Sequence, residues 1–194
     1  MHAPTSTHWA AVKRLLCYLN WTRDLGIHLT SSTLISLLGY SDADWGDNPD
    51  DRMSTGAYVI FLGANPISWS STKQRTVARS STEAEYRAIA SATAEIEWIK
   101  YLLHELGITI PATLVIYSDN FGTTYLYGNL VFHSWMKHLA LDYHFVRDLV
   151  QSNKLRVTHV SGADQLTDAL KKSVPRLCLL QLCSKIGVSD GSPT

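Results

Sequence analysis

The stretch G-A-Y-V-I-F-L-G-A-N-P-I-S-W-S-S, residues 56–71, predicts a β-hairpin and decides the fold class. Its first half is rich in β-branched and aromatic residues, and Gly63–Pro66 is a turn between two strands. Pro66 fits the start of a strand, where the ladder does not need its missing N–H. A further strand is expected just before the hairpin, over about 34–44, with Tyr40 and later acids alternating on one face. The region therefore predicts three meandering strands.

Downstream of the hairpin, strands and helices alternate. A helix is expected over about 82–106, ended by Gly107, with an apolar stripe at helical spacing: Tyr86, Ile89, Ala90, Thr93, Ile96, Leu103 and Leu106. The run T-L-V-I-Y-S, residues 113–118, is typical of a strand buried on both faces. Meandering strands followed by helix-alternating ones predict an α/β fold, a mixed sheet with helices packed on it. The other expected elements are an amphipathic helix over about 7–20, a short helix after Asp119, a helix over about 134–151, a strand over 154–160 and a final helix from about Ala163.

The composition describes one domain with a substantial core. The chain has 194 residues, of which 45 % are hydrophobic. Its 17 basic and 17 acidic residues balance, so any contact with nucleic acid must rest on local charge. No run approaches about 18 apolar residues, which excludes a membrane span. Three cysteines without a C-x-x-C pair favour a reducing compartment, so we expect an intracellular protein, cytoplasmic or nuclear and not secreted.

Four carboxylates stand at the ends of expected elements. Asp42 closes the first strand, Glu85 opens the long helix, and Asp119 follows the buried strand. Asp168 lies in the last expected helix. Sites in open sheets gather beyond the carboxyl ends of adjacent strands, so Asp42 and Asp119 converge if their strands are neighbours. Each like-charged pair at about 4 Å costs on the order of 4 kcal/mol at an effective dielectric near 20, and divalent cations remove that repulsion. Oxygen ligands favour Mg²⁺ or Mn²⁺, which points to two-metal phosphoryl chemistry.

Longer motifs connect these acids to a known family. The sequence carries, in this order, the strings G-Y-S-D-A-D-W, S-T-G-A-Y-V-I-F-L-G, I-S-W-S-S, T-V-A-R-S-S-T-E-A-E-Y-R-A-I-A, V-I-Y-S-D-N, F-H-S-W-M-K-H, D-Y-H-F-V-R and D-Q-L-T-D-A-L. Together they resemble the ribonuclease H domain of copia-type LTR-retrotransposon Pol polyproteins. The opening M-H-A-P-T…H-W-A-A-V-K-R-L-L-C-Y-L resembles the stretch that joins reverse transcriptase to ribonuclease H. We therefore expect a connecting segment at 1–33, a ribonuclease H domain at 34–188 and a flexible tail at 189–194.

The resemblance implies a ribonuclease H-like fold, in which a mixed five-stranded sheet combines a three-stranded antiparallel meander with two parallel strands. It also implies that Asp42, Glu85, Asp119 and Asp168 are the catalytic and metal-binding carboxylates. By similarity, Asp42 bridges two Mg²⁺ or Mn²⁺ ions, Asp168 helps to hold the ion that activates water, and Glu85 with Asp119 holds the ion that stabilises the leaving 3′ oxygen. The family hydrolyses the RNA strand of RNA–DNA hybrids, and the reverse transcriptase portion of the polyprotein is the implied partner.

Local alternatives exist for several of these acids. Asp44, two residues further along the same strand face, is the alternative to the first aspartate. Glu85 stands three residues after Thr82, so its alternative role is the acid of a capping box. With Glu85 as a ligand, Glu83 is expected to be a solvent-facing acid of the first helical turn. Asp119 is also a candidate N-cap for the next helix, a role compatible with metal binding.

Basic residues and histidines complete the candidate site. Lys73, Arg75 and Arg79 lie in a stretch without acids that leads to the long helix, and we expect them to contact phosphates, a solvated loop being the alternative. His159, nine residues before Asp168, is a candidate auxiliary residue for product release. Three further histidines have a spacing loosely like that of a zinc finger, without a preceding cysteine pair, and their role stays open: His133, His138 and His144.

The chain also departs from the family pattern. The usual L-T-K after the last carboxylate is L-K-K here, at Leu170, Lys171 and Lys172. There is no Y-x-D-D motif, which excludes reverse transcription by this chain. The leading hypothesis is a metal-dependent ribonuclease H. The alternatives are a catalytically inactive, folded transposon remnant with at most weak nucleic-acid binding, and another nuclease or an integrase on the same fold.

Overall fold

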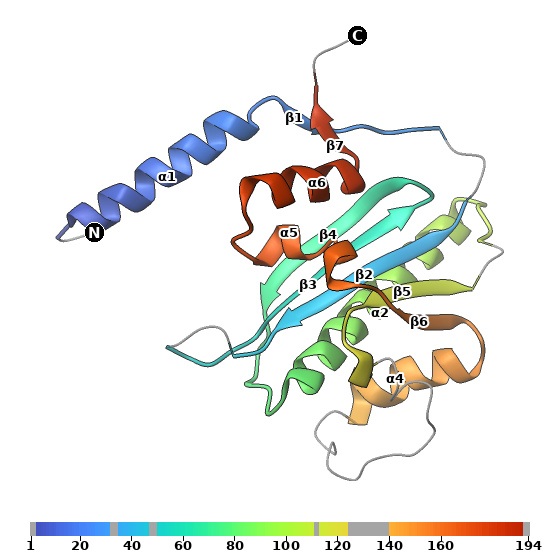
Figure 1. The fold of residues 1–194 in the computed structure, drawn as a ribbon. Coiled ribbons are helices and arrows are strands. Elements are labelled where there is room, and N and C mark those ends of the chain that lie inside the picture. The colour runs from blue at the N-terminus through green and yellow to red at the C-terminus, as the bar shows by residue number, and fades with distance from the viewer. Residues whose placement is uncertain (1–2, 32–34, 47–49, 111–112, 124–139, 192–194) are drawn as a thin grey trace.

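The fold is built on a mixed five-stranded sheet (Figure 1). The computed structural model describes residues 3–31, 35–46, 50–110, 113–123 and 140–191. The strand order is β4-β3-β2-β5-β6; β2, β3 and β4 form an antiparallel meander, and β5 is parallel to both β2 and β6. This confirms the predicted fold class. The strands are β2 (Leu37–Asp44), β3 (Thr55–Leu62), β4 (Asn65–Lys73), β5 (Leu114–Ser118) and β6 (Leu155–His159).

The predicted hairpin is the pair β3–β4. Gly63 lies in its turn with φ +61°, a left-handed conformation that glycine adopts at little cost. Pro66 lies opposite Phe61, and β4 is an edge strand of the sheet. A proline is tolerated there because an edge strand has one side without a ladder partner.

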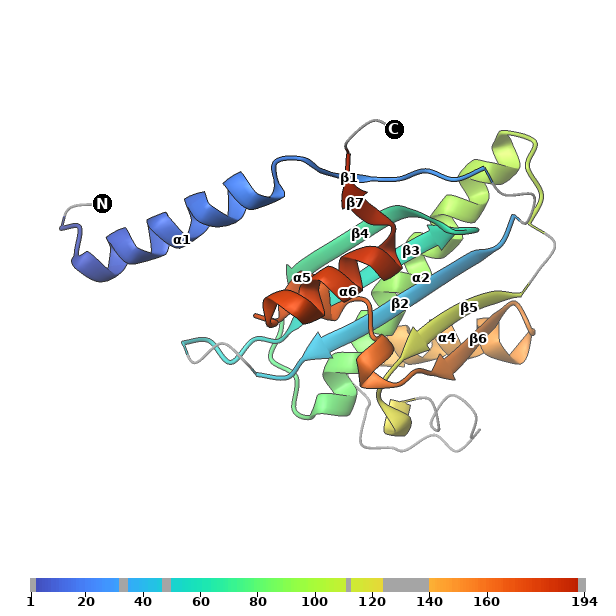
Figure 2. The ribbon, with the colours of Figure 1, turned by 45° about the horizontal axis from the view of Figure 1, so that its top comes forward.

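Helices cover both faces of the sheet (Figure 2). The helices α2 (Ser81–Glu105) and α4 (Ala140–Gln151) lie on one face, and α5 (Asp168–Lys171) with α6 (Arg176–Ile186) lies on the other. Successive side chains of a strand point to opposite faces, and the core divides accordingly. Ile60 belongs to the apolar cluster that includes α2, whereas Val59 and Phe61 belong to a second cluster with Leu182 of α6.

The long helix α2 supplies much of the main core. Of the apolar stripe predicted for it, Tyr86, Ile89 and Ile96 are fully buried against the sheet. Leu106, predicted at the end of the same stripe, is exposed because the helix ends at Glu105 and the chain turns away at Gly107, where φ is +78°.

The N-terminal helix α1 (Ser6–Thr22) has the predicted position but no buried residue. It extends away from the sheet, and its C-terminal end approaches α6, where the Arg176 guanidinium lies 5.4 Å from the centre of the Trp21 ring (Figure 1). Within the described part of the chain, no helix is both long and apolar enough to cross a membrane.

The C-terminal region differs from the prediction of one final helix. The chain instead forms the 3₁₀ turn η2 (Gly162–Asp164), the short α5 and then α6. Between η2 and α5, the buried Gln165 donates a hydrogen bond from Nε2 to the backbone oxygen of Ser41 in β2, at 3.1 Å. Pro175 precedes α6 and disfavours helical backbone at the residue before it. The buried Gln165 and Pro175 therefore interrupt the single final helix that the sequence predicted.

The C-terminal end forms a strand that the sequence did not indicate. Gly187 ends α6 with φ +87°, and β7 (Val188–Asp190) then pairs with β1 (Leu25–Ile27). Residues 189 and 190, predicted as the start of a flexible tail, are therefore hydrogen-bonded strand residues. The boundary between segments 1–33 and 34–188 stays a prediction, since residues 32–34 lie outside the described residues.

Candidate active site

Asp42 lies near the carboxyl end of β2, the middle strand of the sheet, and is buried. The backbone N–H of Ala43 donates hydrogen bonds both to Asp42 Oδ1, at 2.7 Å, and to Glu85 Oε1, at 3.1 Å. One backbone donor therefore orients two carboxyl groups that stand 43 positions apart in the sequence.

Glu85 reaches Asp42 because α2 begins close to the end of β2. Trp45, just after β2, donates from its indole Nε1 to the backbone oxygen of Ala78, at 3.0 Å, and so holds the loop before the helix. The side chains between the helix and the strand are small, which permits this close approach. They form a buried cluster of Ala43, Ala78, Ala84 and Ala88.

Asp119 is placed by the sheet register. It directly follows β5, which is the parallel neighbour of β2, and Tyr40 stands opposite Tyr117 in that pair. Continuing each strand by two residues brings Asp42 and Asp119 to the same edge of the sheet. The strands β2 and β5 are neighbours, so the condition set for the convergence of Asp42 and Asp119 is met.

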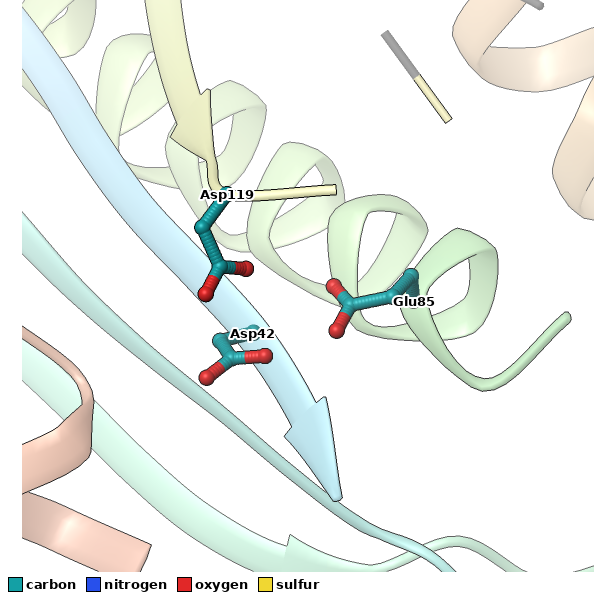
Figure 3. A group of neighbouring side chains, drawn as sticks. All are labelled: Asp42, Glu85 and Asp119. Atoms are coloured by element: carbon teal, nitrogen blue, oxygen red, sulfur yellow. The ribbon is translucent and has the colours of Figure 1, made fainter. Parts of the chain in front are cut away.

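The three acids form one cluster. Asp42, Glu85 and Asp119 each place a carboxylate oxygen so that all three atoms lie within 4.8 Å of one another (Figure 3). They come from β2, from α2 and from the end of β5. Segments far apart along the chain therefore converge on one point at the carboxyl edge of the sheet.

The cluster shows strong electrostatic coupling. Burial, together with the hydrogen bond and negative charge of Asp42, raises the pKa of Glu85 well above its ordinary value. Burial opposes ionisation of Asp42 as well, but the hydrogen bond with Glu85 and the charge of Lys171 outweigh it and lower the pKa of Asp42. Burial and the charge of Asp42 raise the pKa of Asp119. Without a bound metal, these shifts favour a proton on Glu85 beside an ionised Asp42.

Asp168 lies at the same end of the sheet but is joined to the cluster through two lysines. It begins α5, and Lys171 Nζ lies 3.4 Å and Lys172 Nζ 2.7 Å from its Oδ1. Both ammonium groups also form ion pairs with Asp42 Oδ2. Asp168 is not a member of the group of three whose oxygens lie within 4.8 Å.

The local alternatives resolve in different ways. Asp44 is paired with Lys171 at 2.8 Å and does not belong to the three-carboxylate group. Ser80, not Thr82, caps α2, so Glu85 is not the acid of a capping box. The prediction that Glu83 faces solvent is wrong: its side chain is 3 % exposed and binds Arg87 at 2.6 Å, because the helix start is packed against its own preceding loop.

Asn120, and not Asp119, caps the short helical turn that follows β5. Asn120 Oδ1 accepts a hydrogen bond from the backbone N–H of Thr123, at 3.1 Å, in the short helical turn that follows β5. The carboxylate of Asp119 is therefore not needed to cap that turn.

The donor set fits a hard divalent cation. Three carboxylates offer oxygen ligands from rigid elements, the type of ligand that Mg²⁺ and Mn²⁺ prefer. Glu85 Oε2 is buried and accepts no hydrogen bond from the described residues. A buried carboxylate oxygen in that state is a natural ligand atom for a cation.

Sequence comparison places the chain among retrotransposon polyproteins. Over 194 residues it is 54 % identical to the retrovirus-related Pol polyprotein from transposon RE2 of Arabidopsis thaliana and 53 % identical to that from transposon RE1. Over 183 residues, 94 % of this chain and 14 % of the relative, it is 36 % identical to the Pol polyprotein from transposon TNT 1-94 of Nicotiana tabacum. The chain belongs to the copia-type Pol polyproteins. It spans 13 % of the length of RE1 and RE2 Pol, and no family model matches it.

Solved structures identify the fold of this Pol segment. The LC11-RNase H1 structure from compost superposes with a TM-score of 0.54 at 15 % identity, covering 71 % of this chain and 93 % of that one. The N-terminal RNase H domain of a Mycobacterium tuberculosis protein gives a TM-score of 0.51 at 13 % identity, covering 77 % and 97 %. The Pol segment therefore has the ribonuclease H fold, as predicted.

The structure adds two residues to the site of this Pol segment. Lys171 is buried among carboxylates, and Gln165 ties the segment before α5 to the backbone of β2. The sequence signal for Lys171 was the L-K-K departure from the family pattern, to which no role was assigned. Gln165 gave no signal, because a glutamine within a predicted helix is ordinarily exposed.

The predicted basic residues Lys73, Arg75 and Arg79 are exposed. Lys73 is paired with Asp51 at 2.7 Å, and its role as a phosphate contact stays a prediction, as do those of Arg75 and Arg79. Lys73 and Arg75 line a hollow of about 430 Å³ that also includes Ala88, one turn along α2 from the cluster.

The histidines are only partly described. His159 ends β6 opposite Ser118 in register, next to Asp119, and its ring stacks on Phe121 with centroids 3.6 Å apart. His144 is exposed on α4. The other two members of the finger-like set, His133 and His138, lie outside the described residues, so the zinc hypothesis stays open.

Proposed function

We propose that this Pol segment is a divalent-metal-dependent ribonuclease H that hydrolyses the RNA strand of RNA–DNA hybrids. The observation that carries the proposal is the convergence of Asp42, Glu85 and Asp119 at the carboxyl edge of a ribonuclease H fold. Homology to Pol polyproteins supports a nuclease of this type, and so does the structure of LC11-RNase H1 in complex with an RNA/DNA hybrid, whose fold this chain shares with a TM-score of 0.50.

The acids have distinct parts in this proposal. Bound Mg²⁺ or Mn²⁺ would activate water and neutralise charge on the phosphate and the leaving oxygen. In this proposal Asp42 is common to both parts of the ligand set, because it clusters with Glu85 and Asp119 and shares the ion pairs of Lys171 and Lys172 with Asp168. Glu85 must release the proton that it shares with Asp42 before both can act as anionic ligands.

The protein surface supports a polyanionic substrate through local charge only. The proposed phosphate contacts are exposed: Lys73 ends β4, and Arg75 and Arg79 lie on the loop that leads to α2. Selection of a hybrid would rest on groove shape and on the 2′-hydroxyl groups of the RNA strand. Because the chain has no net charge, we expect weak binding by this segment alone, with the reverse transcriptase portion of Pol as the partner that strengthens it.

His159 is proposed as an auxiliary residue. It stands at the end of β6, beside the end of β5 that carries Asp119. Its ring is partly exposed and is held by stacking on Phe121. A side chain in that place can assist release of the product from the cluster.

The test is cleavage of a labelled RNA–DNA hybrid by the purified chain at saturating Mg²⁺ or Mn²⁺, beside RNA duplex and DNA duplex controls. We expect cleavage of the RNA strand in the hybrid alone, and loss of cleavage in Asp42→Asn and Asp119→Asn. A folded chain, checked by circular dichroism, that cleaves nothing at saturating metal would contradict the proposal.

The second candidate is a folded Pol remnant without catalytic activity. One observation favours it: the ammonium group of Lys171 is paired with Asp42, the acid at the centre of the cluster. The same cleavage assay separates the two candidates.

A further inference from the structure

Lys171 places a positive charge inside the acidic cluster. Its side chain is 1 % exposed, and its Nζ forms ion pairs with Asp42 Oδ2, with Asp44 Oδ1 at 2.8 Å and with Asp168 Oδ1 at 3.4 Å. A lysine this deeply buried is rare unless it is paired, and here three carboxylates pair with it. The cluster thus contains an internal cation of its own.

The position of Lys171 is set by the backbone. It lies three residues after Asp168 in α5, and residues at that spacing share one helix face. The helix packs against β3 and β4, and Gln165 fastens the preceding segment to Ser41, the residue before Asp42. The backbone that carries Lys171 is therefore held beside the cluster, and the side chain, 1 % exposed, lies out of open solvent.

The neighbouring lysine differs in this respect. Lys172 contacts the same two aspartates, Asp42 at 3.7 Å and Asp168 at 2.7 Å, but its side chain is 43 % exposed. Its charge is screened by water, and its stem is free to swing away when another cation binds. The two lysines form a natural comparison within one site.

We propose that the Lys171 ammonium occupies the cation position of Asp42 and competes there with a divalent metal ion, so that metal binding requires its displacement. This inference rests on the proposed function in one respect, the use of Asp42 as a metal ligand. The predicted consequence is a metal affinity set by Lys171: the chain binds Mn²⁺ weakly, and removing the ammonium group strengthens binding.

The experiment measures Mn²⁺ binding to the full chain, by the electron paramagnetic resonance signal of free Mn²⁺ and by calorimetry. The variants are Lys171→Met, which keeps the length of the stem without its charge, and Lys171→Arg, which keeps the charge. Lys172→Met is the comparison within the site, and Lys100→Met is the control because Lys100, within the described part of the chain, forms its ion pair with Glu97 on α2, at 3.2 Å.

We expect Lys171→Met to lower the Kd for Mn²⁺ by at least about tenfold, since a unit charge a few ångströms from a divalent cation repels it strongly. Lys171→Arg should bind as weakly as the wild type, Lys172→Met should change Kd by less than about threefold, and Lys100→Met should not change it. Adding Asp42→Asn to Lys171→Met should abolish the gain.

Two results would overturn the inference: an unchanged or higher Kd in Lys171→Met, or an equal gain in Lys172→Met. If Lys171→Met does not fold, Lys171→Gln takes its place under the same criteria. The two proposals fail separately. Tighter Mn²⁺ binding without hybrid cleavage would refute only the proposed activity, and cleavage by the wild type with an unchanged Kd in Lys171→Met would refute only the role of Lys171.

Discussion

Glu85→Gln is expected to stabilise the metal-free protein, and increasingly so as the pH rises. Burial and the neighbouring Asp42 raise the pKa of Glu85 from 4.5 to about 10. A carboxyl group whose pKa is raised on folding contributes stability below its unfolded pKa and loses it as the pH rises through the folded pKa. Glutamine resembles the protonated acid: Oε1 can still accept from the N–H of Ala43, and its amide can donate to Asp42 as the proton does.

The magnitude follows from the pKa of the unfolded chain. Above 4.5, each pH unit lowers the stability of the wild type relative to the variant by about 1.4 kcal/mol, until the folded pKa is reached. Between pH 5 and pH 8, the stability of Glu85→Gln relative to the wild type can therefore rise by at most about 4 kcal/mol. We expect a rise of at least about half of that maximum. The full value is not expected, because Glu85 and Asp42 titrate as a coupled pair and the site relaxes when Glu85 ionises.

The assay is urea unfolding in EDTA at four pH values from 5 to 8, for the wild type and Glu85→Gln. The matched control is Glu105→Gln, which makes the same chemical change at the exposed end of the same helix. Only the change in unfolding free energy that exceeds the change in Glu105→Gln is assigned to Glu85. The reasoning is refuted if the stability gap stays constant with pH, or if the wild type is the more stable protein at pH 8.

Three further predictions concern the core, the terminal ribbon and the basic loop. Ile96→Ala removes a fully buried side chain between α2 and the sheet, so urea unfolding should show a loss of about 3 kcal/mol, and a loss below 1 kcal/mol would contradict its burial. Gly187→Ala forces a side chain onto φ +87°, which should cost about 1 kcal/mol and increase hydrogen exchange in β1 and β7; unchanged exchange would argue against the ribbon. The double charge reversal Lys73→Glu with Arg75→Glu should raise KM for the hybrid, with little change in kcat, and flatten the dependence of KM on salt, whereas a loss confined to kcat would remove these residues from the substrate path.

The sequence was sufficient for those parts of the fold that depend on short-range patterns. The hairpin carried its own turn residues, and the alternating and all-apolar runs distinguished the meander from the parallel strand β5. The convergence of Asp42 and Asp119 then followed from a general property of parallel neighbours. The role of Glu85 was harder to predict, because an acid near the start of a helix can also belong to a capping box. Only the structure, in which Ser80 is the N-cap of α2, excluded that alternative.

Tertiary contacts decided what the sequence could not. A-D-Q-L-T-D-A-L has helical spacing, but Gln165 is drawn into the core by the backbone oxygen of Ser41, a residue 124 positions away. The apolar stripe of α1 was equally clear in the sequence, yet no residue of that helix is buried. Periodicity identifies an apolar face and does not say which surface covers it.

The segment from Gln165 to Lys172 links these observations. Gln165 fixes the approach to β2, and the short turn of α5 then carries an acid and a base on one face, Asp168 and Lys171. The same turn of α5 therefore brings both the Asp168 carboxylate and the Lys171 ammonium group towards Asp42. A divalent ion between Asp42 and Asp168 must replace a cation that the same helical turn holds in place. Under the proposed role of Lys171, the affinity of this cluster for metal depends on that ammonium group as well as on the carboxylates.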